Sequence, residues 1–324
     1  MQTTLEPVEA RRRAWSSYWQ GGALHSCPSS FSGNYQGAIG ALWRDLADQL
    51  RPPLRVLDLG TGNGALPKLL WQHLNGSQDL VIDAVDLAQL RPDWHDAGKF
   101  PGIHFHPGVA METLPFASQS FDCAVSQYGI EYAQRPRVFD EVLRVTKPTA
   151  QLLFVMHHAD GELVRVAQEE SGHQAWLLAS GGLLEAAAEV LPWIARARQG
   201  QSLAGVPEAE AARQRYNQLM GQLQQRAQMS SVPDLLNEVG AWLHRLLAHG
   251  QNTAPSALRQ AEQQLEQARF RTEELVACAL DSEQIGSIAD HFRSARPSAR
   301  VLVDTVRQDD RVLGWSLRVD GRGY

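Results

Sequence analysis

The sequence of 324 residues predicts an α/β fold in which helices cover both faces of a mostly parallel sheet. Short β runs alternate with helical segments over residues 51–159, at the spacing of βαβ units. A glycine-rich loop joins the first of these runs to a helix. A long stretch of helical composition then interrupts the alternation, and two further β runs close the chain. We therefore expect one α/β core that carries a helical insert.

Five short apolar runs are expected to form the parallel strands. They are Arg55–Leu59, Leu80–Asp86, Ile103–His106, Phe121–Ser126 and Gln151–Met156. Helices are expected before and between them, at Val8–Trp19, Gln36–Gln49, Ala65–Leu74, Arg137–Val145 and in a short stretch near Ala88. Two last runs, Val301–Val306 and Val312–Val319, flank a polar turn and predict a hairpin.

Residues 160–280 are rich in Ala, Gln, Glu, Leu and Arg, and they predict a helical insert. Within them, apolar residues recur with alternating gaps of three and four, which gives one helix a narrow seam for packing on another. The seam consists of Leu258, Ala261, Leu265, Ala268, Thr272 and Leu275. Packing within the insert is the simpler explanation, and a contact in a homodimer is the alternative. After the insert, Asp281–Gln284 predicts a capping box at the start of the last helix.

Composition and charge disfavour several classes of protein. The formal net charge is −6, whereas nucleic-acid binders usually concentrate basic residues on one surface. The one dense basic run, Arg11–Arg13, is expected to be a solvated helix face. Three cysteines far apart in the sequence predict neither a disulfide framework nor a metal site. No apolar stretch suggests a signal peptide or a membrane span. We therefore expect a soluble cytoplasmic protein with a small-molecule substrate and with no nucleic-acid, membrane or metal partner.

The loop after the first β run indicates the type of ligand. Gly60, Gly62 and Ala65 satisfy the loose fingerprint of dinucleotide binders, in which backbone N–H groups and a positive helix end hold the ligand. Asp58 lies inside the strand, just before this loop, where a carboxylate would repel the pyrophosphate of NAD or FAD. The same carboxylate would attract the ammonium and sulfonium groups of S-adenosylmethionine. Asp58 therefore favours that cofactor over a dinucleotide.

The stretch Val56–Gly64 (VLDLGTGNG) closely resembles motif I of the class I S-adenosylmethionine-dependent methyltransferases. Three further features resemble motifs of that family in the same order: Asp86 at the end of the second run, Leu114–Asp122, and Glu141–Pro148. The resemblance covers roughly residues 50–158 and 282–320. It implies a Rossmann-like sheet of seven mostly parallel strands, with an antiparallel last strand in the terminal hairpin.

The resemblance also implies a cofactor site. In the family, the acid at the position of Asp86 holds both ribose hydroxyls through charge-assisted hydrogen bonds. Many members carry an acid for the adenine amino group where this chain has Ala110, so Glu112 or the backbone near Met111 is expected to replace it. The expected cofactor residues are Asp58, Gly60, Thr61, Gly62, Asn63, Gly64, Asp86, Leu87, Met111, Glu112, Gln127 and Tyr128.

Candidate substrate and catalytic residues follow the fourth and fifth β runs, because ligands bind beyond the carboxyl ends of parallel strands. His157 and His158 follow the fifth run, where either imidazole suits a general base, and a structural role is the alternative for both. The residues expected to contact substrate, each with packing as the alternative, are Tyr18, His25, Glu131, Tyr132 and Trp176.

We therefore predict four segments. Residues 1–50 form a helical and aromatic lid, residues 51–159 the cofactor-binding core, residues 160–280 a helical insert over the substrate, and residues 281–324 the last helix and hairpin of the core. Aromatic side chains that suit the lid, or simply pack, are Trp15, Tyr18, Trp19, His25, Phe31 and Tyr35.

The predicted activity is methyl transfer from S-adenosylmethionine to an O or N atom of a small aromatic or lipophilic molecule. One alternative is a regulatory protein that binds the cofactor without transferring its methyl group. The other is an NAD(P)-dependent oxidoreductase, which Asp58 disfavours.

Overall fold

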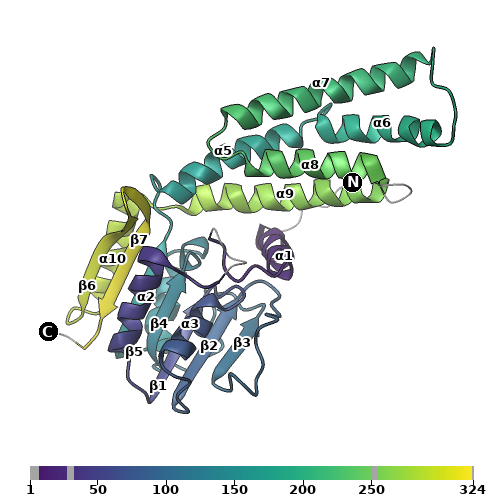
Figure 1. Ribbon diagram of the computed structural model, residues 1–324. Helices are drawn as coiled ribbons and strands as arrows, with labels where there is room; N and C mark the ends of the chain where they lie inside the picture. Colours follow the sequence, from purple (N-terminus) through teal and green to yellow (C-terminus); the bar gives the residue numbers. More distant parts are fainter. Residues whose placement is uncertain (1–6, 28–32, 250–253, 323–324) are drawn as a thin grey trace. The chain divides into compact units, whose positions relative to one another are not determined.

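The computed structural model describes residues 7–27, 33–249 and 254–322. Seven strands form one sheet in the order β3-β2-β1-β4-β5-β7-β6 (Figure 1). Strands β1 to β5 pair in parallel, and β7 is antiparallel to both of its neighbours. The predicted Rossmann-like sheet with an antiparallel last strand is thus confirmed, as is the helical insert after strand five.

The strands lie close to the predicted runs, with ends that differ by a few residues. They are β1 (Leu54–Leu59), β2 (Leu80–Asp86), β3 (Ile103–Pro107), β4 (Phe121–Gln127), β5 (Thr146–Met156), β6 (Arg300–Gln308) and β7 (Arg311–Asp320). The helices that belong with the sheet are α1 (Pro7–Gln20), α2 (Gly37–Gln49), α3 (Ala65–His73), the 3-10 turn η1 (Ile130–Tyr132), α4 (Arg137–Val145) and α10 (Ser282–Ala295).

Two hydrophobic clusters cover the two faces of the sheet. Successive side chains of a strand point to opposite faces, so Val56 and Leu57 of β1 belong to different clusters. Trp43 of α2 packs in the cluster that contains Val56, and Phe292 of α10 packs in the cluster that contains Leu57. Burial on both faces explains why these strands are nearly continuous apolar runs.

The prediction of a short helix near Ala88 is wrong. Residues 87–102 form turns and bends among the described residues. The Asp86 carboxylate accepts a hydrogen bond from the backbone N–H of Ala88 (2.8 Å). Such local side-chain bonds compete with helix formation, and Pro92 further disfavours it. The chain therefore leaves β2 as a loop that turns beside the glycine-rich segment.

The chain divides into two compact units, residues 1–164 with 274–324, and residues 165–273. The boundaries fall inside α5 (Glu162–Leu177) and α9 (Ala254–Cys278). Between these helices come α6 (Leu183–Arg198), α7 (Pro207–Met229) and α8 (Asp234–His249). None of the described helices combines the length and the apolar character needed to cross a bilayer.

The helical unit has a hydrophobic core of its own. Buried leucines from four helices meet there, among them Leu183, Leu223, Leu243, Leu258 and Leu265. The last two belong to the predicted seam on α9, so packing within the insert accounts for them.

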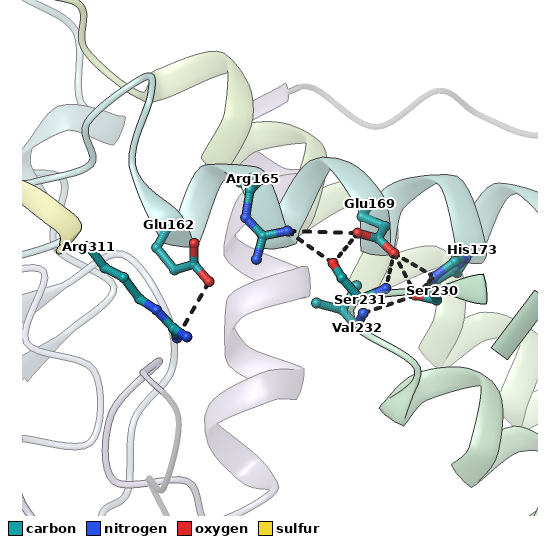
Figure 2. Close-up of polar contacts among 8 residues, drawn as sticks. All are labelled: Glu162, Arg165, Glu169, His173, Ser230, Ser231, Val232 and Arg311. Atoms are coloured by element: carbon teal, nitrogen blue, oxygen red, sulfur yellow. Dashed lines mark hydrogen bonds and ion pairs between the residues drawn. The ribbon is translucent and has the colours of Figure 1, made fainter. Parts of the chain in front are cut away.

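Glu169 of α5 holds the turn between α7 and α8, as Figure 2 shows. Its carboxylate accepts hydrogen bonds from the Ser230 hydroxyl (2.6 Å), the Ser231 hydroxyl (2.6 Å) and the Ser231 backbone N–H (2.8 Å). These hydrogen bonds lower the pKa of Glu169 to about 2. The His173 ring lies 2.8 Å from the Ser230 hydroxyl oxygen and completes the network.

The predicted capping box begins α10 and can be tested by substitution. Asp281 accepts from the Gln284 backbone N–H (2.8 Å), and the Gln284 side chain accepts from the Asp281 N–H (3.0 Å). Replacing Asp281 with Ala should lower the free energy of unfolding by about 1 kcal/mol, measured by chemical denaturation. Glu283→Ala removes a charge from the same turn without removing the cap. An equal loss in both variants would show that the cap is not the cause.

Candidate active site

Loops at the carboxyl ends of β1, β2 and β4 enclose a cavity of about 70 Å³ together with α1 and the segment after it. Nine residues predicted for the site line this cavity: His25, Gly60, Thr61, Asp86, Leu87, Met111, Gln127, Tyr128 and Tyr132. Further lining residues include Arg11, Arg12, Trp15, Trp19, Ser26 and Tyr35. The cavity thus lies at the edge of the sheet where ligands of open α/β folds bind.

The glycine-rich loop bends tightly at the end of β1. The backbone N–H groups of Gly60 and Thr61 both donate to the Val85 carbonyl (3.0 Å each). Gly60 and Gly62 have positive φ values of 69° and 53°, which favour glycine. A side chain at Gly62 would also collide with the Trp19 ring. Glycine is therefore required where this loop approaches α1.

Asp58 is buried behind this loop and is 1% exposed. Burial raises the pKa of Asp58 to about 7; the adjacent Thr61 hydroxyl opposes this rise, and the Asp86 carboxylate adds to it. A carboxylate without a cationic partner favours its neutral form in such surroundings. Asp58 is thus poised to ionise when a cationic group approaches.

Asp86 ends β2 and faces the cavity. One of its oxygens accepts from the Gly62 N–H (2.8 Å) and the other from the Ala88 N–H (2.8 Å). Burial raises the pKa of Asp86 to about 6, although these two hydrogen bonds oppose the rise. Each carboxylate oxygen keeps a further lone pair, so the group can still accept hydrogen bonds from vicinal hydroxyls.

Three other predicted cofactor residues have different surroundings. The Asn63 side chain donates to the carbonyls of Trp19 and Ala23 (2.8 Å each), so it connects the loop to the N-terminal segment. Gly64 has a positive φ and abuts the Phe105 ring. Glu112 accepts from the Gln134 N–H (2.7 Å).

Four buried polar atoms at this end of the sheet have no hydrogen-bond partner among the described residues. They are Asp58 Oδ2, Thr61 Oγ1, Gln127 Nε2 and Glu131 Oε2; the Thr61 hydroxyl lies close enough to Asp58 to lower its pKa but does not meet hydrogen-bond geometry. The Gln127 amide is oriented by Trp43, whose indole N–H donates to Oε1 (2.6 Å) and leaves Nε2 as a free donor. Because buried polar atoms are nearly always hydrogen-bonded, this group suits a polar ligand with both donors and acceptors.

Glu131 and His157 form a buried pair. Glu131 Oε1 lies 2.7 Å from His157 Nδ1 and also accepts from the His157 backbone N–H (2.9 Å). The side chains are 0% and 4% exposed, respectively. The His157 ring stacks on Tyr128 (4.3 Å between centroids) and meets Tyr132 edge-on (6.0 Å). His157 does not itself line the cavity, but its ring contacts two residues that do, Tyr128 and Tyr132.

His158 points elsewhere, although it is the next residue. Its ring stacks on Trp315 at 4.2 Å, and its Nδ1 accepts from the Asp160 N–H (3.0 Å). Burial lowers the pKa of His158. Of the two predicted bases, His157 is the one whose ring contacts cavity-lining residues.

The remaining predicted substrate residues lie in different places. His25 is buried and stacks on Tyr35 at 4.6 Å, and the Tyr18 ring packs against Trp19 at 4.8 Å. Trp176 belongs to the helical unit, where the Arg226 guanidinium lies 5.5 Å from its ring. Phe31 lies outside the described residues.

Arg11 corrects the expectation that Arg11–Arg13 is a solvated face. It forms an ion pair with Glu274 (2.7 Å), donates to the Tyr132 carbonyl (2.7 Å) and lines the cavity. Arg12 also lines the cavity and is paired with Glu9 (2.6 Å), whereas Arg13 is exposed. No local pattern in the sequence indicates the Arg11 contacts, because both partners are distant in the chain.

Comparison with known proteins gives a family match for the centre of the chain. Residues 57–154 match the model of a family described as a methyltransferase domain. The ubiquinone/menaquinone biosynthesis C-methyltransferase UbiE of Legionella pneumophila (strain Corby) is 32% identical over 119 residues, which cover 35% of this chain and 47% of that protein. The malonyl–acyl-carrier-protein O-methyltransferase of Methylococcus capsulatus is 32% identical over 131 residues, which cover 37% and 46%.

The chain therefore spans about half the length of the relatives that it matches. Among solved structures, a SAM-dependent methyltransferase from Aquifex aeolicus is 16% identical, with coverage of 48% of this chain and 76% of that chain and a TM-score of 0.34. The matched residues run from the middle of β1 to β5 and include the acid and glycines of the first loop and the acid that ends β2. Residues 57–154 are therefore similar to a methyltransferase domain, and the sheet with its antiparallel last strand is the one that the sequence predicts for the class I, S-adenosylmethionine-dependent type.

Proposed function

We propose that the chain binds S-adenosylmethionine in the cavity at the strand ends and transfers its methyl group to a small molecule. The observation that supports this most directly is the set of unpartnered buried atoms on Asp58, Thr61, Gln127 and Glu131. The cofactor brings an ammonium, a carboxylate and a sulfonium, which match acceptors and donors of that set. Two acids with raised pKa values, Asp58 and Asp86, suit a cationic ligand better than a pyrophosphate.

The proposed cofactor contacts follow the resemblance and the observed lining. Asp86 is proposed to hold the ribose hydroxyls, and Leu87 and Met111 to border the adenine. Asp58, Thr61 and Gln127 are proposed to hold the amino-acid part, beside the glycine-rich loop. Bound there, the cofactor supplies a methyl group on a good leaving group, so catalysis depends mainly on alignment and on exclusion of water.

We propose His157 as the residue that accepts a proton from the acceptor. The Glu131 carboxylate beside Nδ1 favours the tautomer with a proton on Nδ1, which leaves Nε2 as the basic nitrogen. The cavity walls of Trp15, Trp19 and Tyr132 suit a flat or lipophilic acceptor. We propose an O or N atom as the methyl acceptor, as expected from the sequence. Carbon is the alternative, because the relatives are named as C- and O-methyltransferases.

Binding of S-adenosylhomocysteine by the full chain tests the cofactor site. Asp86→Asn should weaken this binding by about 1–3 kcal/mol in isothermal titration calorimetry, because charge-assisted hydrogen bonds to the ribose are lost. Asp79→Asn, at the exposed residue just before β2, is the control and should leave affinity unchanged. Tight binding of NADH with no heat from S-adenosylhomocysteine would contradict the proposal.

The buried Asp58 carboxyl should make the stability of the ligand-free protein depend on pH. Its pKa is raised on folding, so the folded state binds the proton more tightly than the unfolded state does. This contribution is fully present below the unfolded pKa of about 4 and is lost as pH rises through about 7. Asp58→Asn should therefore be more stable than the wild type at pH 8, by about 2–4 kcal/mol, and similar to it at pH 4.

Denaturation of both proteins across this pH range measures the difference, and calorimetry completes the test. The same variant should bind S-adenosylhomocysteine at least tenfold more weakly at pH 8, because the ammonium loses its carboxylate. A variant that is destabilised at pH 8 and retains full affinity would show that Asp58 has a structural role instead.

Turnover measurements can distinguish the roles of His157 and His158. With labelled S-adenosylmethionine and a panel of phenols, amines and thiols, His157→Ala should lower the rate by about 10²–10⁴-fold and flatten its pH profile. His158→Ala, one residue away, should keep the wild-type profile. The reverse pattern would assign the base to His158. Cofactor binding with no turnover on any acceptor would instead favour a regulatory protein.

A further inference from the structure

Helix α1 covers the cofactor cavity with one face. Arg11, Trp15 and Trp19 recur at intervals of four residues, so they lie on the same side of the helix, and all three line the cavity. The Trp15 and Trp19 rings stack at 5.9 Å, and Trp15 meets Tyr132 edge-on at 5.8 Å. The aromatic face of α1 thus forms a wall of the cavity.

The cavity is too small for a nucleoside cofactor while α1 stays in this position. Its volume is about 70 Å³, whereas pockets for drug-sized ligands occupy about 300–1,000 Å³. The opposite wall consists of strand ends that belong to the buried sheet, such as Asp86 and Gln127. Strand ends within a packed core deform less readily than a peripheral helix, so α1 is better able to move than the strand ends are.

Contacts outside α1 hold the helix in place. It has 14 residues, and isolated helices of this length are only marginally stable in water. The Trp19 carbonyl accepts from the Asn63 side chain (2.8 Å), and the Ser16 hydroxyl accepts from the Gln89 N–H (2.9 Å). Near the other end of the helix, Arg11 makes the charged contacts.

The Arg11 guanidinium binds two partners from separate parts of the sheet-containing unit. Its Nε and Nη2 lie 2.8 Å and 2.7 Å from Glu274 Oε1, and its Nη1 donates to the Tyr132 carbonyl (2.7 Å). The Arg11 and Glu274 side chains are only 28% and 15% exposed, so solvent screens this pair less than it screens a surface pair. Glu274 is also the first residue of the chain after the helical unit.

We propose that Arg11 is a positioning residue that latches α1 over the cavity through Glu274 and the Tyr132 carbonyl, so that release of this latch admits and discharges the nucleoside. The proposal rests on the proposed function for the identity of the nucleoside, but the latch itself does not. Arg11 acts through α1, by holding Trp15 and Trp19 against the cavity.

Hydrogen exchange in the ligand-free full chain tests the latch. Arg11→Met and Glu274→Gln should each speed exchange of the α1 amides about tenfold, because local opening becomes easier. The double variant should show little further change, since both substitutions break one interaction. Arg13→Met, which removes an exposed arginine from the same helix, should match the wild type. Wild-type exchange in both single variants would overturn the latch.

Rates of S-adenosylhomocysteine binding test the gating role, with tryptophan fluorescence in a stopped-flow instrument as the signal. Arg11→Met should raise the association and dissociation rate constants together, by about tenfold, and change Kd by less than about threefold. Arg11→Lys, which keeps the charge but not the fork of donors, should lie between this variant and the wild type. Loss of affinity without faster association would assign Arg11 to ligand contact and overturn the gating role. Faster α1 exchange in a protein that binds no S-adenosylhomocysteine would keep the latch and overturn the proposed function.

Discussion

The buried carboxylates of Asp58 and Asp86 are the constraint on which the site depends. Both are placed by neighbouring parallel strands, and among the described residues no lysine or arginine forms an ion pair with either. Burying such groups costs free energy, which appears here as the raised pKa of each. The extensive apolar packing on both faces of the sheet offsets this cost. Two acids kept without a cation at the ligand-binding edge of a sheet make sense when a cationic ligand supplies the missing partner.

Local patterns in the sequence were sufficient to predict the sheet and the glycine-rich turn after β1, because both depend on short stretches of chain. The apolar β runs, the glycines after Asp58 and the acid at Asp86 carry their information in adjacent residues. The capping box at Asp281 was predicted for the same reason. The prediction of a helix near Ala88 was wrong: the chain turns there, with the Ala88 N–H bonded to the Asp86 carboxylate, and Pro92 disfavours a helix in the residues before it.

Contacts between distant residues could not be predicted in this way. Arg11 and Glu274 are 263 residues apart, and Glu131 and His157 are 26 apart. The sequence predicted that His157 and His158 lie at the end of one strand, but it could not indicate which of the two is the better candidate base. In the structure, their rings stack on different residues, Tyr128 and Trp315, as expected when successive side chains leave an extended backbone on opposite sides. The proximity of Glu131 to only one of them depends on where the 3-10 turn η1 brings that carboxylate.

The two units differ in what they can contribute to the reaction. Every residue that lines the cavity at the strand ends belongs to the sheet-containing unit, whereas residues 165–273 pack around a separate leucine core, with Glu169 bonded to the turn between α7 and α8. Changes in the core of residues 165–273 therefore leave the residues that line the cavity unchanged. Glu274, which forms the ion pair with Arg11, directly follows the helical unit in the sequence but belongs to the sheet-containing unit. The contact between Arg11 and Glu274 therefore lies within the sheet-containing unit, so the proposed latch on α1 requires no residue of the helical unit.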